Sequence, residues 1–149
     1  MRDMDDHFLH LGVIYEDLPD LIELGVRVTH GEWSAVSTVY ASPSFFIENG
    51  EELLRWIAAP RLPLRIEAGA DTGIGWMVLQ FYTINHACHA RCAITLATKT
   101  LSNDSRPAET ARLGIELPTE LGLIERFARE CISLGGNFKR EARLIGLPS

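Results

Sequence analysis

The sequence lacks the features that would place it in several large functional classes. Its 149 residues contain no apolar run close to the roughly 18–20 residues that a membrane-spanning helix needs. Asp3, Asp5 and Asp6 precede the short apolar segment 8–15, which is the wrong charge for a secretory signal. There are only three cysteines, an odd number, so we expect reduced thiols and no disulfide framework. These absences predict a cytoplasmic protein with no membrane partner.

Runs of lysine or arginine are also missing. The chain has 20 acidic and 14 basic residues, a net charge of −6, whereas a protein that holds nucleic acid normally shows a basic patch or stripe. We therefore expect no nucleic-acid partner. The charge is uneven, with −8 in residues 1–60 and +2 in residues 61–149. The acids nearest the N-terminus are Asp3, Asp5, Asp6, Glu16, Asp17, Asp20 and Glu23.

Motifs that carry known catalytic chemistry are absent as well. The sequence contains no G-x-S-x-G elbow, no H-E-x-x-H pair and no Walker loop. The glycine-rich segment 69–75 has no following Lys-Ser/Thr and leads into an expected strand, so it does not predict a phosphate site. We assign no catalytic residue and expect no cofactor. A non-enzymatic role is favoured, although an enzyme is not excluded.

One cluster has the residue types of a metal site: His86, Cys88, His89 and Cys92. Zinc needs about four such ligands converging at roughly 2.0–2.3 Å. In a straight strand His89 would point away from the other three side chains, and a turn at 85–88 would break even that partial convergence. Neighbouring strand residues face opposite sides, so Cys88 and His89 do not form a nucleophile–base pair either. We therefore interpret the cysteines as small buried hydrophobes and predict no metal.

Alternating apolar residues predict most of the secondary structure. Strands are expected at 21–29, 33–40, 62–68, 75–84, 89–100, 110–117 and 138–147, with a hairpin joining the first two through residues 30–32. Residues 1–20 are less regular and predict either an extra edge strand or a loose acidic arm. Consecutive strands with short connections favour antiparallel sheet. No internal repeat is visible.

Two helices interrupt the strands. Asn49 and Glu52 have the capping-box spacing and Pro60 follows Ala59, which predicts a helix at about 50–59. Pro118 opens a second helix at about 119–134, where apolar residues recur at three- and four-residue steps up to Gly135-Gly136. The chain is therefore expected to form a single α+β domain over residues 1–149, with a mostly antiparallel sheet and two main helices. The predicted core is Val26, Val28, Leu64, Ile66, Ile94, Leu96, Leu113, Ile115, Ile124 and Phe127.

Several segments together resemble a known family. They are the strand Leu21–Val28, the Gly31-Glu32-Trp33-Ser34 hairpin with Val39-Tyr40, His89–Leu96, Ile115–Leu117, Leu123–Glu130 and Glu141–Leu144. The chain is similar here to small, largely uncharacterised bacterial α+β proteins, some of which resemble immunity proteins of polymorphic toxin systems. It departs from their pattern at Cys88, where glycine is more usual, and in its N-terminal extension. The resemblance implies a toxin-neutralising role and carries over no catalytic residues.

Two functional hypotheses follow. The first is a protein-binding module that meets a basic protein, such as a toxin, through Glu16, Asp17, Asp20 and Glu23; the plain alternative is that these acids only solvate the surface. Trp33, next to the hairpin turn, is a further candidate because tryptophan is enriched at interfaces. The second hypothesis is a small-molecule-binding protein or unrecognised enzyme with a pocket between helix and sheet. A homo-oligomer is compatible with both.

Overall fold

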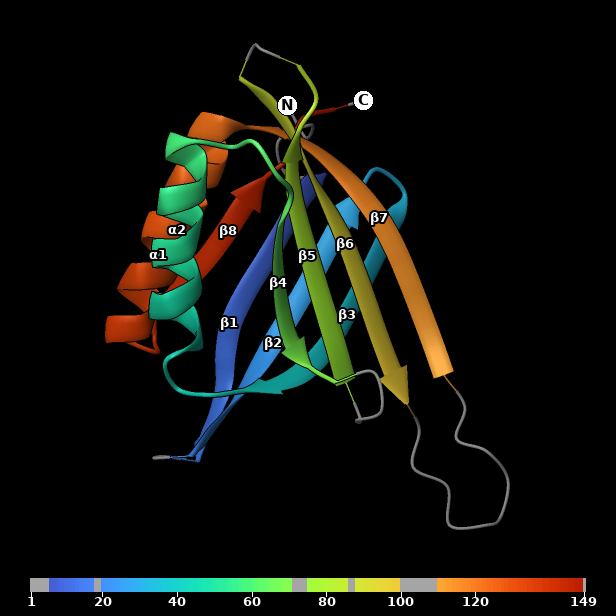
Figure 1. Ribbon diagram of the computed structural model, residues 1–149. Helices are drawn as coiled ribbons and strands as arrows, with labels where there is room; N and C mark the ends of the chain where they lie inside the picture. Colours follow the sequence, from blue (N-terminus) through green and yellow to red (C-terminus); the bar gives the residue numbers. More distant parts are fainter. Residues whose placement is uncertain (1–5, 18–19, 71–74, 86–87, 100–109, 149) are drawn as a thin grey trace.

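A computed structural model describes residues 6–17, 20–70, 75–85, 88–99 and 110–148, which form two four-stranded antiparallel sheets and two helices (Figure 1). Sheet A has the strand order β3-β2-β1-β8 and sheet B the order β4-β5-β6-β7. The expected α+β domain of mostly antiparallel sheet and two main helices is confirmed. The elements are β1 (His7–Asp17), β2 (Leu21–His30), β3 (Trp33–Ala41), α1 (Phe45–Ala58), β4 (Leu64–Gly69), β5 (Gly75–Thr83), β6 (His89–Lys99), β7 (Thr110–Glu120), α2 (Leu121–Gly136) and β8 (Glu141–Ile145).

The order of elements is duplicated along the chain. Three strands, a helix and a strand occur twice, first as β1-β2-β3-α1-β4 and then as β5-β6-β7-α2-β8. The last strand of each half joins the sheet of the other half, because β4 pairs with β5 and β8 pairs with β1. Neither sheet can therefore be completed by one half alone. The duplication is invisible in the sequence because strand pairing requires matching apolar alternation and not matching residues.

The core lies between the inner faces of the two sheets and the two helices, which run together along one side of the molecule (Figure 1). All ten predicted core residues belong to it. Seven are buried, and Leu64, Leu113 and Ile115 are partly buried and pack against them. Among the described residues, neither helix combines the length and apolar character needed to cross a membrane.

Residues 7–17 are neither a loose arm nor an edge strand. They form β1, which lies between β2 and β8 in the middle of sheet A. Leu9 and Leu11 of this strand are buried in the core. The local sequence could not reveal this position, because one of the two partners of β1 is β8, at the far end of the chain.

Both helices have different bounds from those predicted. The segment 45–47, which lies before the predicted start of the helix, is the first turn of α1, where Phe45 and Phe46 are buried. Asn49 is not the cap: its side-chain amide donates to the Phe45 carbonyl at 2.8 Å, inside the helix. Pro118 belongs to β7, and α2 begins at Leu121.

Gly135-Gly136 does not stop α2 but forms its last turn. A Cβ on Gly135 would lie 2.3 Å from Cγ1 of Ile47 in α1. A side chain at this position would clash with α1, so the close approach of the two helices explains the glycine. The helix ends at Asn137, whose N–H donates to the Ser133 and Leu134 carbonyls. Close contact between the two helices fixes how they cover the sheets.

A pair of histidines joins β1 to β2 at the end of sheet A. The Nδ1 atoms of His7 and His30 lie 2.9 Å apart, and their rings meet edge to face. Burial, followed by the neighbouring charges of His7 and Arg91, lowers the pKa of His30 from its usual 6.5. The folded protein therefore disfavours the protonated form of His30.

We expect this histidine to make the fold sensitive to acid. Below pH 6.5 the unfolded chain takes up a proton on His30 that the folded chain does not, so the free energy of unfolding falls as the pH drops from 6.5 toward the lowered pKa. Urea unfolding at about pH 7.5 and about pH 5.5 measures how far the free energy of unfolding falls in acid. This decrease should be smaller for His30→Gln than for the wild type. His89→Gln, at an exposed histidine of sheet B, is the control. An equal decrease in the free energy of unfolding for the wild type and His30→Gln would contradict the prediction.

Candidate functional site

The acids selected from the sequence meet at one hairpin. Strands β1 and β2 pair so that Glu16 lies opposite Ile22 and Asp17 opposite Leu21, which brings both ends of the connection together. Glu16 and Asp20 are exposed, and Glu23 is half-buried one pair further along β2. We call Glu16, Asp20 and Glu23 the acidic tip. Asp17 lies on the same hairpin, and its side chain falls outside the described residues.

Exposed apolar and aromatic side chains surround the acidic tip. Tyr15 and Tyr40 both lie opposite Glu23 in the strand pairing, on either side of it, and are 63% and 44% exposed. Ile14 and Leu21 are also exposed at this end of the sheet. Large tyrosines set among charged residues are typical of protein-binding surfaces, because each ring can bury a wide area at low entropic cost.

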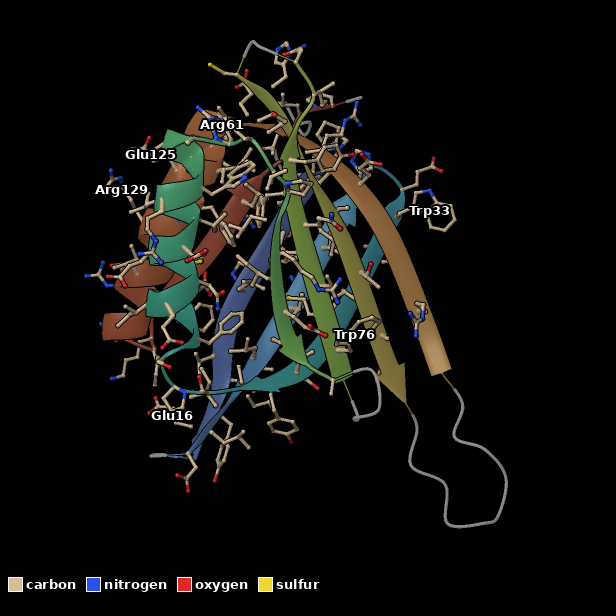
Figure 2. The ribbon with its side chains drawn as sticks, viewed as in Figure 1. Glu16, Trp33, Arg61, Trp76, Glu125 and Arg129 are labelled. Atoms are coloured by element: carbon tan, nitrogen blue, oxygen red, sulfur yellow. The ribbon has the colours of Figure 1, made fainter. Side chains whose placement is uncertain are left out.

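Trp33 does not belong to this surface. It is 68% exposed, but it lies at the start of β3, beside the turn that joins β2 to β3. Figure 2 shows Glu16 and Trp33 at opposite ends of sheet A. The ten residues of β2 separate the two places, which at about 3.3 Å per residue is roughly 30 Å. A single small contact cannot include both.

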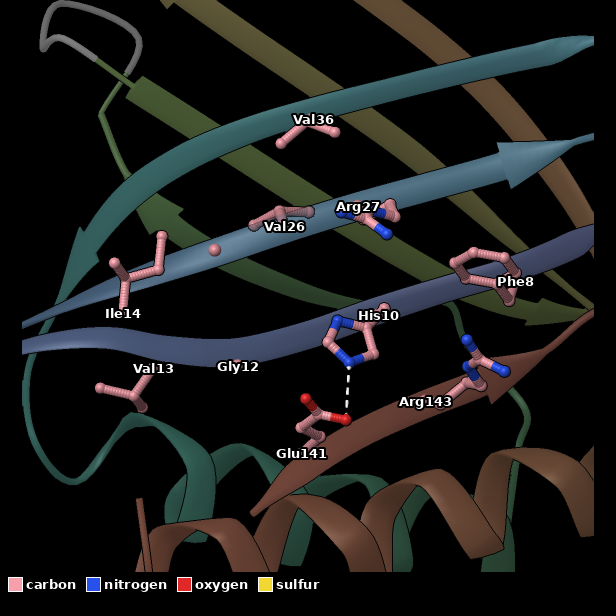
Figure 3. Close-up of a pocket in the computed structure, with 11 residues that line it drawn as sticks. Phe8, His10, Gly12, Val13, Ile14, Val26, Arg27, Val36, Glu141 and Arg143 are labelled. Atoms are coloured by element: carbon pink, nitrogen blue, oxygen red, sulfur yellow. Dashed lines mark ion pairs between the residues drawn. The ribbon is translucent and has the colours of Figure 1, made fainter. Parts of the chain in front are cut away.

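A hollow lies next to the acidic tip, on the face of sheet A that points away from sheet B (Figure 3). Its volume is about 440 Å³. Gly12 of β1 and Gly25 of β2 lie directly opposite each other, so no side chain rises from either strand at this point. We call this site the glycine hollow. Apolar side chains of Phe8, Ile14 and Val36 and charged side chains of Arg27, Glu141 and Arg143 stand around it.

Two arginines and a histidine gather on one flank of the glycine hollow. Arg27 lies opposite His10, and His10 lies opposite Arg143, so the three occupy one row across sheet A. His10 Nε2 is 3.1 Å from the Glu141 carboxylate, and the Arg143 guanidinium lies 4.4 Å from the centre of the Phe8 ring. Arg27 is exposed and forms no ion pair with the residues that the structure describes. This flank presents hydrogen-bond donors to the hollow.

The metal-type cluster does not converge. Cys92 points into the core and is fully buried, as predicted, but the prediction was wrong for Cys88, which is exposed, as is His89. Burial raises the pKa of the Cys92 thiol, which keeps it protonated and unreactive. His86 lies outside the described residues. Within the ranges that are described, no three His, Cys, Asp or Glu residues come together as metal ligands.

Little space is left between the helices and the sheets among the described residues. A cavity there measures only about 10 Å³ and is walled by residues such as Phe46, Leu53 and Phe127, all of which are buried in the core. This cavity is too small to be the ligand pocket that the second hypothesis places there. The open hollow lies on the opposite side of sheet A.

Comparison with known proteins adds no assignment: no protein-family model, no curated protein and no solved structure matches this chain. The site must be interpreted from its own residues. Sequence reasoning identified the acidic tip but missed Tyr15, Tyr40 and the glycine hollow. The available signal was a glycine inside the apolar segment 8–15 and another inside the expected strand 21–29, because a glycine within a strand often marks a close approach to the backbone.

Proposed function

We propose that the protein is a non-enzymatic binding module whose acidic tip contacts a basic protein. The observation that carries the proposal is the end of the β1–β2 hairpin, where Glu16, Asp20 and Glu23 lie beside exposed Tyr15 and, on the adjacent strand β3, exposed Tyr40. An acidic patch accelerates encounter with a positively charged partner and repels negatively charged ones. The tyrosines then supply the buried contact area that slows dissociation.

The partner that fits this surface best is a basic toxin. The resemblance of the sequence to immunity-type proteins supports such a partner. An enzyme that holds nucleic acid must present positive charge to phosphate, so an acidic inhibitor would complement its binding site. Inhibition then requires only that the bound protein covers that site. No catalytic residue of its own is needed.

The test is association kinetics with the product of the neighbouring gene. Neutralising the acidic tip (Glu16→Gln, Asp20→Asn, Glu23→Gln) should slow association about tenfold at low salt, because the steering charge is removed. The difference should shrink as salt rises from about 50 mM to about 500 mM, since added ions screen exposed charges. Surface plasmon resonance across a salt series measures both effects.

A matched variant separates local from global charge. Neutralising Glu32, Glu48 and Glu51 removes the same charge from exposed acids of the same acidic segment without touching the acidic tip. This control should change the association rate by less than about twofold. If both triple variants slow association equally, or if neither does, the acidic tip is not the contact. Tyr15→Ala and Tyr40→Ala should act mainly on dissociation.

A further inference from the structure

Gly12 has no structural reason to be glycine. Its φ is not in the left-handed region, where Gly31 and Gly69 are the only glycines among the residues that the structure describes. A Cβ added to it would meet the His10 Cε1 at 3.8 Å and the Glu141 Cγ at 4.0 Å, both ordinary contacts. Glycine in the middle of a strand weakens the strand, because it contributes no side chain and loses more backbone freedom on folding. What this glycine provides is the empty space above it.

The other glycine of the pair is partly explained by packing. A Cβ on Gly25 would lie 2.8 Å from Cδ1 of Ile14, whose side chain bends over it. Ile14 is nevertheless 59% exposed, so it forms a wall of the glycine hollow and does not fill it. The outer face of sheet B contrasts with this arrangement. There Trp76 donates to the Glu67 carboxylate and stacks under Arg112.

Charge around the glycine hollow selects the kind of ligand. Two guanidinium groups and an imidazole face a single carboxylate, that of Glu141, and this carboxylate is already bound to His10. Arg27 retains its five donors in the planar fork that matches a carboxylate. The remaining walls, Ile14 and Val36, are apolar. An anion with a hydrophobic body would satisfy both parts of this lining.

We propose that the glycine hollow binds a small organic acid, with its carboxylate against Arg27 and its aromatic or branched apolar body over Gly12 and against Ile14. The volume of about 440 Å³ is that of a small-molecule site. A second copy of the chain is a poor occupant, because it would place one hollow over another and leave the space between them unfilled. Phosphate is also a poor match, because it has no body to cover the apolar walls. The site is independent of the acidic tip.

The experiment uses the full chain and three simple acids: phenylacetate, indole-3-acetate and 4-methylpentanoate. In a ¹H–¹⁵N titration, at least one acid should shift the amide signals of Gly12, Gly25 and Arg27 saturably. Phenylacetamide, the uncharged match of phenylacetate, should bind at least about tenfold more weakly than the acid, because it cannot pair with a guanidinium. Absence of a saturable shift with all three acids, or equal binding of acid and amide, overturns the proposal.

Two variants locate the site. Gly12→Val should reduce affinity for the responding acid at least about tenfold by filling the hollow, and Arg27→Gln should do so by removing the charge. Gly114→Val is the matched control, because Gly114 lies in β7 with nothing within 4 Å of an added Cβ. Its affinity should stay within about twofold of the wild type. An unchanged affinity in folded Gly12→Val protein, or in Arg27→Gln should the first variant not fold, refutes the assignment. The acidic-tip variant should bind the acid normally, so the two proposals can fail separately.

Discussion

Replacing Phe127 with alanine should lower the free energy of unfolding by about 3–5 kcal/mol. Phe127 lies on α2 and is 1% exposed. Its ring centre is 6.4 Å from that of Phe81 in β5, which in turn is 6.3 Å from that of Trp56 in α1. The three rings together therefore join both helices to sheet B. Its removal leaves a cavity that these rigid neighbours cannot close, and the cost rises with the volume left empty.

Urea unfolding monitored by circular dichroism measures this loss. Phe138→Ala is the control, because Phe138 has the same side chain but is only partly buried at the edge of the same core. We expect it to lose less than half as much stability as Phe127→Ala. A Phe127→Ala midpoint equal to that of the wild type would mean that α2 does not turn this face toward the core.

The parts of the fold that were predictable depend on local periodicity. Alternation in the segments 21–29 and 89–100 was sufficient to place Val26, Val28, Ile94 and Leu96 in the core. The same reasoning placed Ile124 and Phe127 on the buried side of α2. The spacing of apolar residues along a strand or helix determines which of its side chains are buried, because the element must turn its apolar face away from water. This holds without knowledge of the neighbouring elements.

Features set by contacts between distant segments were not predictable. The division of the strands into two sheets depends on the exchange of β4 and β8 between the halves, which no local pattern encodes. The glycine hollow exists only because Gly12 and Gly25 fall in register across two strands. The start of α1 was missed for a related reason: Phe45 and Phe46 have strand preferences, but burial against the core makes them helical. Tertiary packing outweighed local propensity at each of these places.

Gly50→Ala should destabilise the protein by about 2–3 kcal/mol, although alanine is the better helix former. Gly50 lies in the middle of α1, where glycine by itself costs about 1 kcal/mol relative to alanine. A Cβ there would lie 2.8 Å from the Ala128 carbonyl oxygen and 2.7 Å from Cγ1 of Ile132, both in α2. The carbonyl belongs to the helix backbone, so the clash is relieved only by moving α1 away from α2.

The sign of the change distinguishes helix contact from helix propensity. Gly122→Ala makes the same substitution near the start of α2, where nothing lies within 4 Å of the added Cβ. Propensity alone then applies, and this variant should be unchanged or more stable by up to about 1 kcal/mol. Thermal and urea unfolding should therefore show a loss of stability for Gly50→Ala and no loss for Gly122→Ala. If Gly50→Ala is also stabilising, the two helices do not pack as closely as the geometry of Gly50 and Gly135 requires. The helix pair would then lie against the sheets in a different arrangement from the one described.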